Sequence, residues 1–204
     1  MAQIYAYDGV VPVIDPAAFV HPAAVVIGDV FVGPACYVGP GAVLRGDFGR
    51  IVLERGSNVQ ETCVVHSFPN LEVVVAEEGH IGHGAVLHGC RIGRNAMVGM
   101  NAVVMDEAVI EENCIVAAMA FVKAGAKIPP NSLVVGAPAR VVRELTSEEI
   151  AWKRQGTAVY QRLALEAKHK LVLTSPLTEA EPGRRRIVAP EYDPLILERL
   201  KLGD

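Results

Sequence analysis

Three histidines between positions 66 and 88 have the residue type and spacing to hold a metal ion. They are His66, His83 and His88, and two of them lie beside glycine, in Gly82-His83-Gly84 and His88-Gly89. Three imidazoles that leave a fourth position open are typical of a catalytic zinc ion, which lowers the pKa of its bound water to about 7. The alternative is three unrelated surface histidines. The remaining histidines share no register with these and are expected to be ordinary side chains: His21, His80 and His169.

The elements that must position these histidines repeat every six residues. A period of six fits a short strand plus a corner, with one aliphatic side chain of each strand turned inward. Three such strands make one triangular turn of about 18 residues, so that residues 18 apart stack at about 4.8 Å. A β-sandwich would instead show longer polar and apolar alternation, with turns every 8 to 12 residues or so. The pattern predicts an all-β, triangular parallel β-helix, here called the coil, from about Val20 to about Val135. The aliphatic residues of the two unbroken runs are Val20, Val26, Val32, Val38, Leu44, Ile92, Val98, Val104, Ile110, Val116, Val122, Ile128 and Val134.

Counting the register brings two of the histidines onto one face of the coil. Three residues are inserted between Leu44 and Leu53, and four more at 67–70, so that Leu44, Val65 and Leu87 are expected to stack. Side chains alternate along a strand, so the residue after each of these points outward. These outward residues form one column: Arg45, His66 and His88.

The same count places His83 elsewhere. Val59 and Ile81 stack on the neighbouring face, where Gln60 projects outward and His83 falls at the following corner. His83 could therefore join the other two histidines only from a neighbouring subunit. We expect a metal site shared between chains.

A helix and a tail follow the repeats. Thr146-Ser147-Glu148-Glu149 is a capping-box signal for a helix start. An apolar stripe at helical spacing is expected to face the coil or a neighbouring subunit: Tyr160, Leu163, Ala167 and Leu171. The tail carries several prolines and the basic run Arg184–Arg186 without periodicity, and is expected to be extended or partly disordered. We therefore divide the chain into the β-helix with its N-terminal lead-in (1–136), a helical segment packed on the coil (137–172) and an extended tail (173–204).

Composition limits the compartment and the partners. The 204 residues are 51% hydrophobic with a formal net charge of −4 and interspersed charges, so nucleic acid is not expected as a partner. The first residues do not resemble a signal peptide, and no apolar stretch is long enough to cross a membrane. We expect a cytoplasmic protein with no membrane contact. The cysteines form no CxxC pair and are expected to be reduced and buried: Cys36, Cys63, Cys90 and Cys114.

Several short motifs resemble the γ-class carbonic anhydrase branch of the hexapeptide-repeat family: Arg45-Gly46-Asp47, Asn58-Val59-Gln60, His66, His80-Ile81-Gly82-His83 and His88-Gly89-Cys90. The resemblance implies a left-handed coil, a homotrimer, and His66, His83 and His88 as ligands shared across the subunit interface. The ion would be Zn²⁺ or another divalent transition metal such as Fe²⁺ or Co²⁺. The resemblance also implies catalytic-site roles for four residues. Gln60 would contact the water at the metal, Asn58 would be a nearby polar group, and Arg45 and Asp47 would form an ion pair between subunits.

Two departures from the efficient carbonic anhydrases favour another reaction. Phe48 stands where those enzymes carry a glutamate, and the short insertion after His66 lacks their acidic proton-shuttle loop. Several segments are most similar to the phenylacetate-degradation thioesterases of this family, with a carnitine-pathway branch next: 44–52, 98–106 and 181–184. This resemblance implies hydrolysis of dead-end, ring-derived coenzyme A thioesters.

Thioester hydrolysis tolerates the missing shuttle acid, because a thiolate leaves readily near neutral pH. An amide donor such as Gln60 would help to stabilise the oxyanion. The alternatives are weak carbon dioxide hydration at the same site, an acyltransferase with a single histidine as general base, and a non-catalytic scaffold that keeps the metal as structure.

Overall fold

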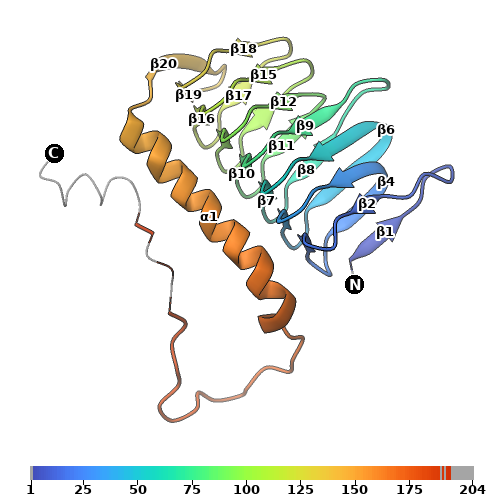
Figure 1. Ribbon diagram of the computed structural model, residues 1–204, viewed down its shortest axis with the longest axis vertical. Helices are drawn as coiled ribbons and strands as arrows, with labels where there is room; N and C mark the ends of the chain where they lie inside the picture. The colour runs from blue at the N-terminus through green and yellow to red at the C-terminus, as the bar shows by residue number, and fades with distance from the viewer. Residues whose placement is uncertain (1, 189, 191, 194–204) are drawn as a thin grey trace, which may run out of the picture.

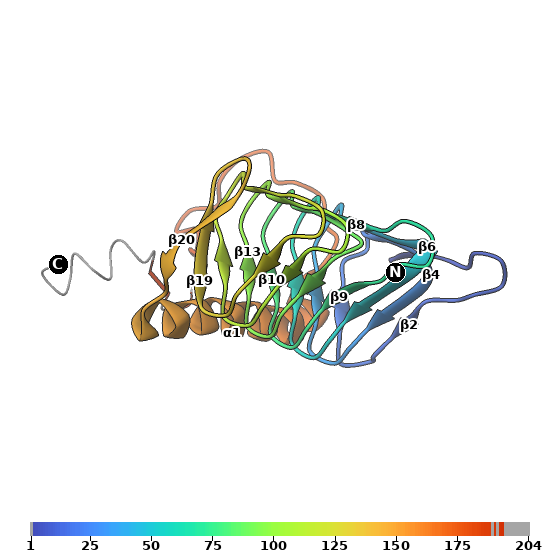
Figure 2. The same cartoon turned by 90° about the horizontal axis from the view of Figure 1, so that it is seen from above.

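The computed structural model describes residues 2–188, 190 and 192–193, and shows a left-handed parallel β-helix with one long helix along its side (Figure 1). Seen from above, the strands stack as successive turns (Figure 2). Buried side chains fill the interior that these turns enclose. The coil has three faces. Strands β4 (Val25–Val32) and β6 (Val43–Leu53) bend through a corner and belong to two of them.

We name each face by what lies on it. The histidine face contains β1 (Gln3–Tyr5), β8 (Val64–His66), β11 (Val86–His88), β14 (Val103–Val104) and β17 (Phe121–Val122). The groove face contains β2 (Val13–Ile14), β9 (Val73–Val75), β12 (Arg91–Ile92), β15 (Val109–Ile110) and β18 (Lys127–Ile128). The helix face contains β3 (Phe19–Val20), β5 (Tyr37–Val38), β7 (Asn58–Val59), β10 (His80–Ile81), β13 (Met97–Val98), β16 (Ile115–Val116) and β19 (Ser132–Val135).

The hexapeptide aliphatics fill the interior, as the sequence predicts. Ile110 and Val116 are fully buried, and Val98 pairs with Val116 one turn on, a register of 18 residues. Removing one such side chain from water contributes about 1.5–3 kcal/mol, and the coil repeats this along its whole length. The four cysteines also lie in this core as free thiols, and burial raises the pKa of Cys63 to about 11.

One corner shows why glycine is needed where the long strands bend. Gly28 has φ +72°, and a Cβ atom built on it would lie 2.4 Å from the carbonyl oxygen of Gly46. The pairing of β4 with β6 shifts register just after Gly28, which accommodates the extra residues of β6. Any larger residue at Gly28 would collide with the backbone of the next turn.

The coil begins earlier than the expected Val20. β1 and β2 both pair in parallel with β4, Ile4 opposite Val26 and Ile14 opposite Val32, so the lead-in forms a first turn. The six-residue pattern misses this turn because residues 6–12 make a long excursion between the two strands. Ile4 keeps 38% of its surface exposed, since the first turn has a neighbouring turn on one side only.

Helix α1 (Ser147–Lys170) lies along the helix face (Figure 1). The capping box is present: the Thr146 hydroxyl accepts from the amide of Glu149, and the Glu149 carboxylate accepts from the amide of Thr146. Buried Lys153 donates to the carbonyl oxygen of Glu78 at 2.6 Å and to Asn95 Oδ1 at 2.9 Å. These bonds satisfy a charged group that would otherwise be costly to bury.

The expected apolar stripe of α1 was partly wrong. Ala167 is buried and Tyr160 packs beside it, but Leu163 and Leu171 are exposed. The buried positions are small or polar instead, which lets the helix lie close to the coil: Glu149, Lys153, Gly156, Thr157, Ala164 and Ala167.

Two further segments complete the chain. Strand β20 (Arg140–Glu144), which the sequence did not predict, pairs antiparallel with β19 at the last turn. The described residues after α1 form neither helix nor strand, and the Tyr192 ring stacks on Trp152 at 5.5 Å. Among the described residues, no helix is long and apolar enough to span a bilayer.

Candidate metal centre

Two of the predicted ligands lie side by side on the histidine face. β8 and β11 pair in parallel with Val65 opposite Leu87 and His66 opposite His88, which confirms the register counted from the sequence. The two imidazole rings are 5.2 Å apart, and His66 Nδ1 lies 3.3 Å from His88 Nε2. Each ring therefore turns one nitrogen toward the other.

This pair fits a divalent metal ion. Two nitrogens bound at 2.0–2.1 Å to a tetrahedral ion lie about 3.3 Å apart, which matches the separation of the two facing nitrogens. Burial, followed by the positive charge of Arg45, lowers the pKa of His66, so its ring remains neutral with a lone pair available. The donor set is thus of the kind that zinc, iron(II) and cobalt(II) accept.

The outer nitrogens of both rings contact carboxylates. His66 Nε2 lies 3.1 Å from Asp47 Oδ1, and His88 Nδ1 lies 2.7 Å from Asp106 Oδ1. Burial alone would raise the pKa of Asp47, but the hydrogen bond and charge of Arg45 outweigh it and lower the pKa. A carboxylate behind a metal-binding imidazole fixes the ring and increases the basicity of its ligating nitrogen.

His83 has the same kind of partner at a different place. It lies at the corner between the helix face and the histidine face, and its Nδ1 is 2.5 Å from Glu61 Oε2. The other oxygen of Glu61 accepts a hydrogen bond from Tyr37 at 3.1 Å. All three predicted ligands therefore have a carboxylate on one ring nitrogen. Of the others, His21 accepts from the amide of Ala23, and His80 lies among amides and a hydroxyl.

The sequence analysis missed Asp106 and Glu61, although the register contained both. Asp106 follows His88 by one 18-residue turn, and Glu61 precedes His83 by 22 residues, one turn plus the four-residue insertion. Extending the count beyond histidines would have found these carboxylates.

One chain does not assemble all three ligands. Within the described part of the chain, no group of three histidine, cysteine, aspartate or glutamate residues is placed to hold a metal ion. His83 precedes His88 by five residues in the chain and lies at the opposite edge of the histidine face. A metal site shared between chains predicts this separation of His83 from His66 and His88. That a second chain supplies His83 stays a prediction.

The other predicted site residues lie in two places. Arg45 bonds Asp47 at 2.7 Å within the chain, because residues two apart on β6 point to the same side. The ion pair that these two residues were expected to form between subunits stays a prediction. Asn58 and Gln60 are buried under α1 beside His80 rather than next to the His66–His88 pair. If they serve the metal site, it must be the site of a second copy.

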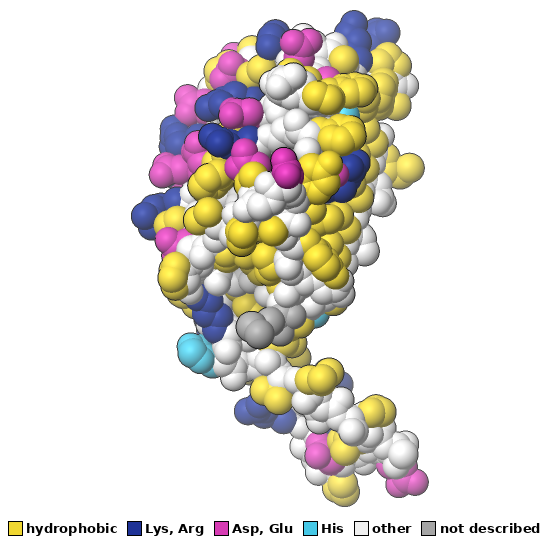
Figure 3. All heavy atoms as spheres, turned by 90° about the vertical axis from the view of Figure 1, so that its right-hand side faces the viewer, with side chains coloured by type: hydrophobic (Ala, Val, Ile, Leu, Met, Phe, Trp, Pro, Cys, Tyr) yellow, Lys and Arg dark blue, Asp and Glu magenta, His cyan; other side chains and the backbone are white. Residues whose placement is uncertain are grey.

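Apolar side chains surround the histidine pair. The Phe48 ring lies 5.3 Å from His66, and the Phe68 ring lies 5.1 Å from His88. A column of outward residues, here called the valine column, continues beside them along the whole face: Val25, Val43, Val64, Val86, Val103 and Phe121. Figure 3 shows hydrophobic side chains extending along one side of the coil, while charged side chains gather toward the upper left.

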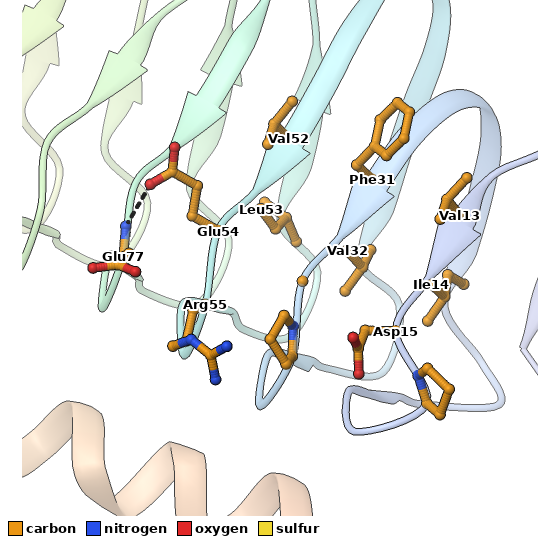
Figure 4. A pocket seen from close by; sticks show the side chains of 13 residues that line it. Val13, Ile14, Asp15, Phe31, Val32, Val52, Leu53, Glu54, Arg55 and Glu77 are labelled. Carbon is orange, nitrogen blue, oxygen red and sulfur yellow. Dashed lines mark hydrogen bonds between the residues drawn. The ribbon is translucent and has the colours of Figure 1, made fainter.

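A groove of about 580 Å³ lies elsewhere, on the groove face near the N-terminal turns (Figure 4). Its apolar wall includes Phe31 and Val52, and its edge carries Asp15, Glu54 and Arg55. It contains none of the predicted ligands or catalytic residues, so the candidate centre is not in this groove.

Replacing Asp106 by asparagine should lower the affinity for zinc about 10-fold to 100-fold. The amide still accepts a hydrogen bond from His88, but it no longer supplies the negative charge that makes the imidazole a better ligand. Competition with a fluorescent zinc chelator measures the change. Asp29→Asn is the matched control, because Asp29 pairs with Arg50 at 3.1 Å away from the histidines. Equal zinc affinity of Asp106→Asn and wild type would contradict the role of Asp106 as the carboxylate that strengthens His88 as a ligand.

Comparison with known proteins agrees with this architecture. The family model "Bacterial transferase hexapeptide (six repeats)" matches residues 89–124. The carnitine operon protein CaiE of Salmonella dublin is 55% identical over 183 residues, 90% of this chain and 92% of that protein. A Bacillus cereus protein described as an acetyltransferase is 34% identical with a TM-score of 0.81, over 82% of this chain and 97% of its own. A hexapeptide transferase family protein from Anaplasma phagocytophilum is 37% identical with a TM-score of 0.77, over 79% and 96%. The chain therefore belongs to the hexapeptide-repeat family, together with the CaiE proteins.

Proposed function

We propose that this protein is a metal-dependent hydrolase of coenzyme A thioesters that works as a homotrimer. His66 and His88 of one copy and His83 of a second copy would hold the ion. The observation that carries the proposal is the set of three carboxylate–histidine pairs, Asp47–His66, Glu61–His83 and Asp106–His88. Metal-binding histidines almost always donate their other ring N–H to a carboxylate, a backbone carbonyl or water, and the presence of a carboxylate on all three favours a metal centre over unrelated surface histidines.

The positions of the ligands suggest how the copies meet. His83 lies at one edge of the histidine face, and the His66–His88 pair lies at the other. One edge of each copy must then meet the opposite edge of the next, a head-to-tail contact that closes into a ring. In a trimer of this kind the histidine faces line the three-fold axis, and the valine column is removed from water. Met100 and Met119 are exposed at the His83 corner and add apolar surface to the same contact.

The residues around the centre suit thioester hydrolysis. A divalent ion held there by the histidines would lower the pKa of a water molecule to about 7 and would polarise a carbonyl oxygen. Asp47 and Asp106 hold the two rings in place, while Phe48 and Phe68 form apolar walls against which an acyl group can pack. The leaving thiolate needs no acid, so no proton donor has to face the sulfur.

The acyl group is proposed from sequence similarity. The resemblance of segments 44–52, 98–106 and 181–184 to the phenylacetate-degradation thioesterases suggests ring-derived acyl groups, whereas the CaiE relatives are named for a carnitine operon. Both classes therefore belong among the substrates to be tested.

The metal-loaded protein should release free thiol from coenzyme A thioesters, and the metal-free protein should not. The test is to purify the protein without added metal, reload it with Zn²⁺, Fe²⁺ or Co²⁺, and assay phenylacetyl-CoA, other aryl-CoA thioesters and carnitinyl-CoA. His169→Ala, on the exposed end of α1, is the control variant and should retain full activity. Full metal occupancy without turnover of any thioester would contradict the proposal and support a scaffold, and rapid carbon dioxide hydration by the same preparation would favour a carbonic anhydrase.

An acyltransferase is the second candidate, favoured by the descriptions of the family model and of the Bacillus cereus structure. Such an enzyme uses a histidine as general base and needs no metal. Adding amine and hydroxyl acceptors to the thioester assay separates the two functions. Thiol release that depends on an acceptor and survives metal removal would establish the transferase.

A further inference from the structure

A tyrosine of the helix face holds the Glu61–His83 pair from behind. Glu61 and His83 lie in the same corner on neighbouring turns, and their side chains are 34% and 47% exposed. A pair this exposed contributes little by itself, because two side chains must be ordered in water. Tyr37 supplies a further contact: its hydroxyl donates to Glu61 Oε1 at 3.1 Å, while Glu61 Oε2 lies 2.5 Å from His83 Nδ1. The two oxygens of one carboxylate therefore join Tyr37 to His83.

Packing fixes the Tyr37 ring. It is 6% exposed and stacks on Phe19 with the ring centres 5.6 Å apart, and Tyr160 of α1 packs against it at 5.4 Å. Ala164 and Ala167 of α1 complete this cluster. A ring enclosed in this way has few positions available, so its hydroxyl is held at one place beside the corner. The hydroxyl is thus a rigid donor that can orient a partly exposed carboxylate.

Charge and burial give each of the three groups a defined role. Burial first, and then the charge of Glu61, raises the pKa of Tyr37, so the phenol remains protonated and donates near neutral pH. An ionised carboxylate only accepts, so the nitrogen of His83 that faces Glu61 must be the protonated one. The lone pair of the His83 ring is then on Nε2, the nitrogen that Glu61 does not contact.

We propose that Tyr37 is a positioning residue: its hydroxyl orients Glu61, and Glu61 in turn fixes the His83 ring with Nε2 free to bind the metal. This inference rests on the proposed function and adds a residue to its site. Tyr37 does for Glu61 what Arg45 does for Asp47, which it bonds at 2.7 Å. Because α1 encloses the Tyr37 ring, the position of His83 also depends on how α1 packs on the coil.

The first arm of the test needs no metal. In crystal structures of the metal-free protein, Tyr37→Phe should leave the ring cluster in place while Glu61 and His83 separate or adopt several conformers. Tyr160→Phe is the matched control and should keep the pair, because it removes a hydroxyl from the same cluster that donates no hydrogen bond to Glu61 within the described part of the chain. An unchanged Glu61–His83 pair in Tyr37→Phe overturns the proposal, as does an equal displacement in both variants.

The second arm measures the effect on metal binding by competition with a zinc chelator. Zinc affinity should fall about 3-fold to 10-fold in Tyr37→Phe and about 10-fold to 100-fold in Glu61→Ala, while Tyr160→Phe binds as wild type. If Tyr37 acts only through Glu61, adding Tyr37→Phe to Glu61→Ala should lower the affinity no further. A further loss in the double variant, or wild-type affinity in Tyr37→Phe, overturns the positioning role. A wild-type protein that binds no zinc would instead refute the proposed function, and the first arm would still decide whether Tyr37 orients His83.

Discussion

Equal amounts of His83→Ala and His88→Ala chains, unfolded and reassembled together, should regain metal binding and thioester hydrolysis that neither variant has alone. Each variant by itself lacks one ligand at every interface, so it should retain no zinc and have no activity. In a mixed trimer, one of the three interfaces joins an intact His66–His88 pair to an intact His83. Each mixed trimer should then have about a third of wild-type activity, and a random equal mixture about a quarter. Zinc content and thiol release measured on the reassembled trimer give the two readouts.

The matched control is a mixture of His66→Ala with His88→Ala chains. Both residues of the pair must come from one chain, since β8 and β11 are neighbouring strands of the same coil. No interface in that mixture is complete, and no activity should return. Recovery in the control, or none in the His83 mixture despite verified mixed trimers, would show that the ligands are divided between chains in another way.

Val64→Glu should convert the trimer into monomers and abolish metal retention. Val64 is 42% exposed in the single chain and lies in the middle of the valine column, directly before the core residue Val65. Three glutamates brought together near the three-fold axis would repel one another and lose water, at a cost of several kcal/mol for each buried charge. The isolated coil should tolerate the change because the side chain points outward. Light scattering and zinc content are the measurements.

Val142→Glu is the control for this variant, because Val142 is 53% exposed on β20 at the end of the helix face. It should remain trimeric and fully loaded. A Val64→Glu protein that stays trimeric with a full complement of zinc would place the subunit interface on another face of the coil.

The sequence predicted those parts of the structure that follow from a repeat. The stacking of Leu44, Val65 and Leu87, and with it the contact of His66 with His88, needs only a count of six-residue steps and two insertions. The single strand β20 and the first turn at β1 and β2 carry no such period. Their pairing depends on which coil edge is free, a property of the assembled fold.

The surroundings of Gln60 were also out of reach of the sequence. An outward position on the coil was predicted correctly, but outward does not mean exposed, because α1 lies over that face and buries the amide. The orientation of α1 in turn depends on polar bonds such as that of Lys153 to Asn95, between residues 58 apart in the chain. The helical spacing of apolar residues contains no information about these bonds. The sequence analysis therefore predicted that Leu163, and not Thr157, faces the coil.

β20 has a consequence for the solubility of the protein. A parallel β-helix ends in a row of free backbone donors and acceptors, which could template the stacking of another molecule and start a fibre. β20 runs antiparallel to β19, breaks the register between Leu133 and Val134, and presents the charged side chains of Arg140, Arg143 and Glu144 at that end. Antiparallel pairing and charge make the last turn a poor match for the first turn of another copy. On the helix face, growth along the coil axis is thereby disfavoured, because β20 occupies the edge that β19 would otherwise leave free.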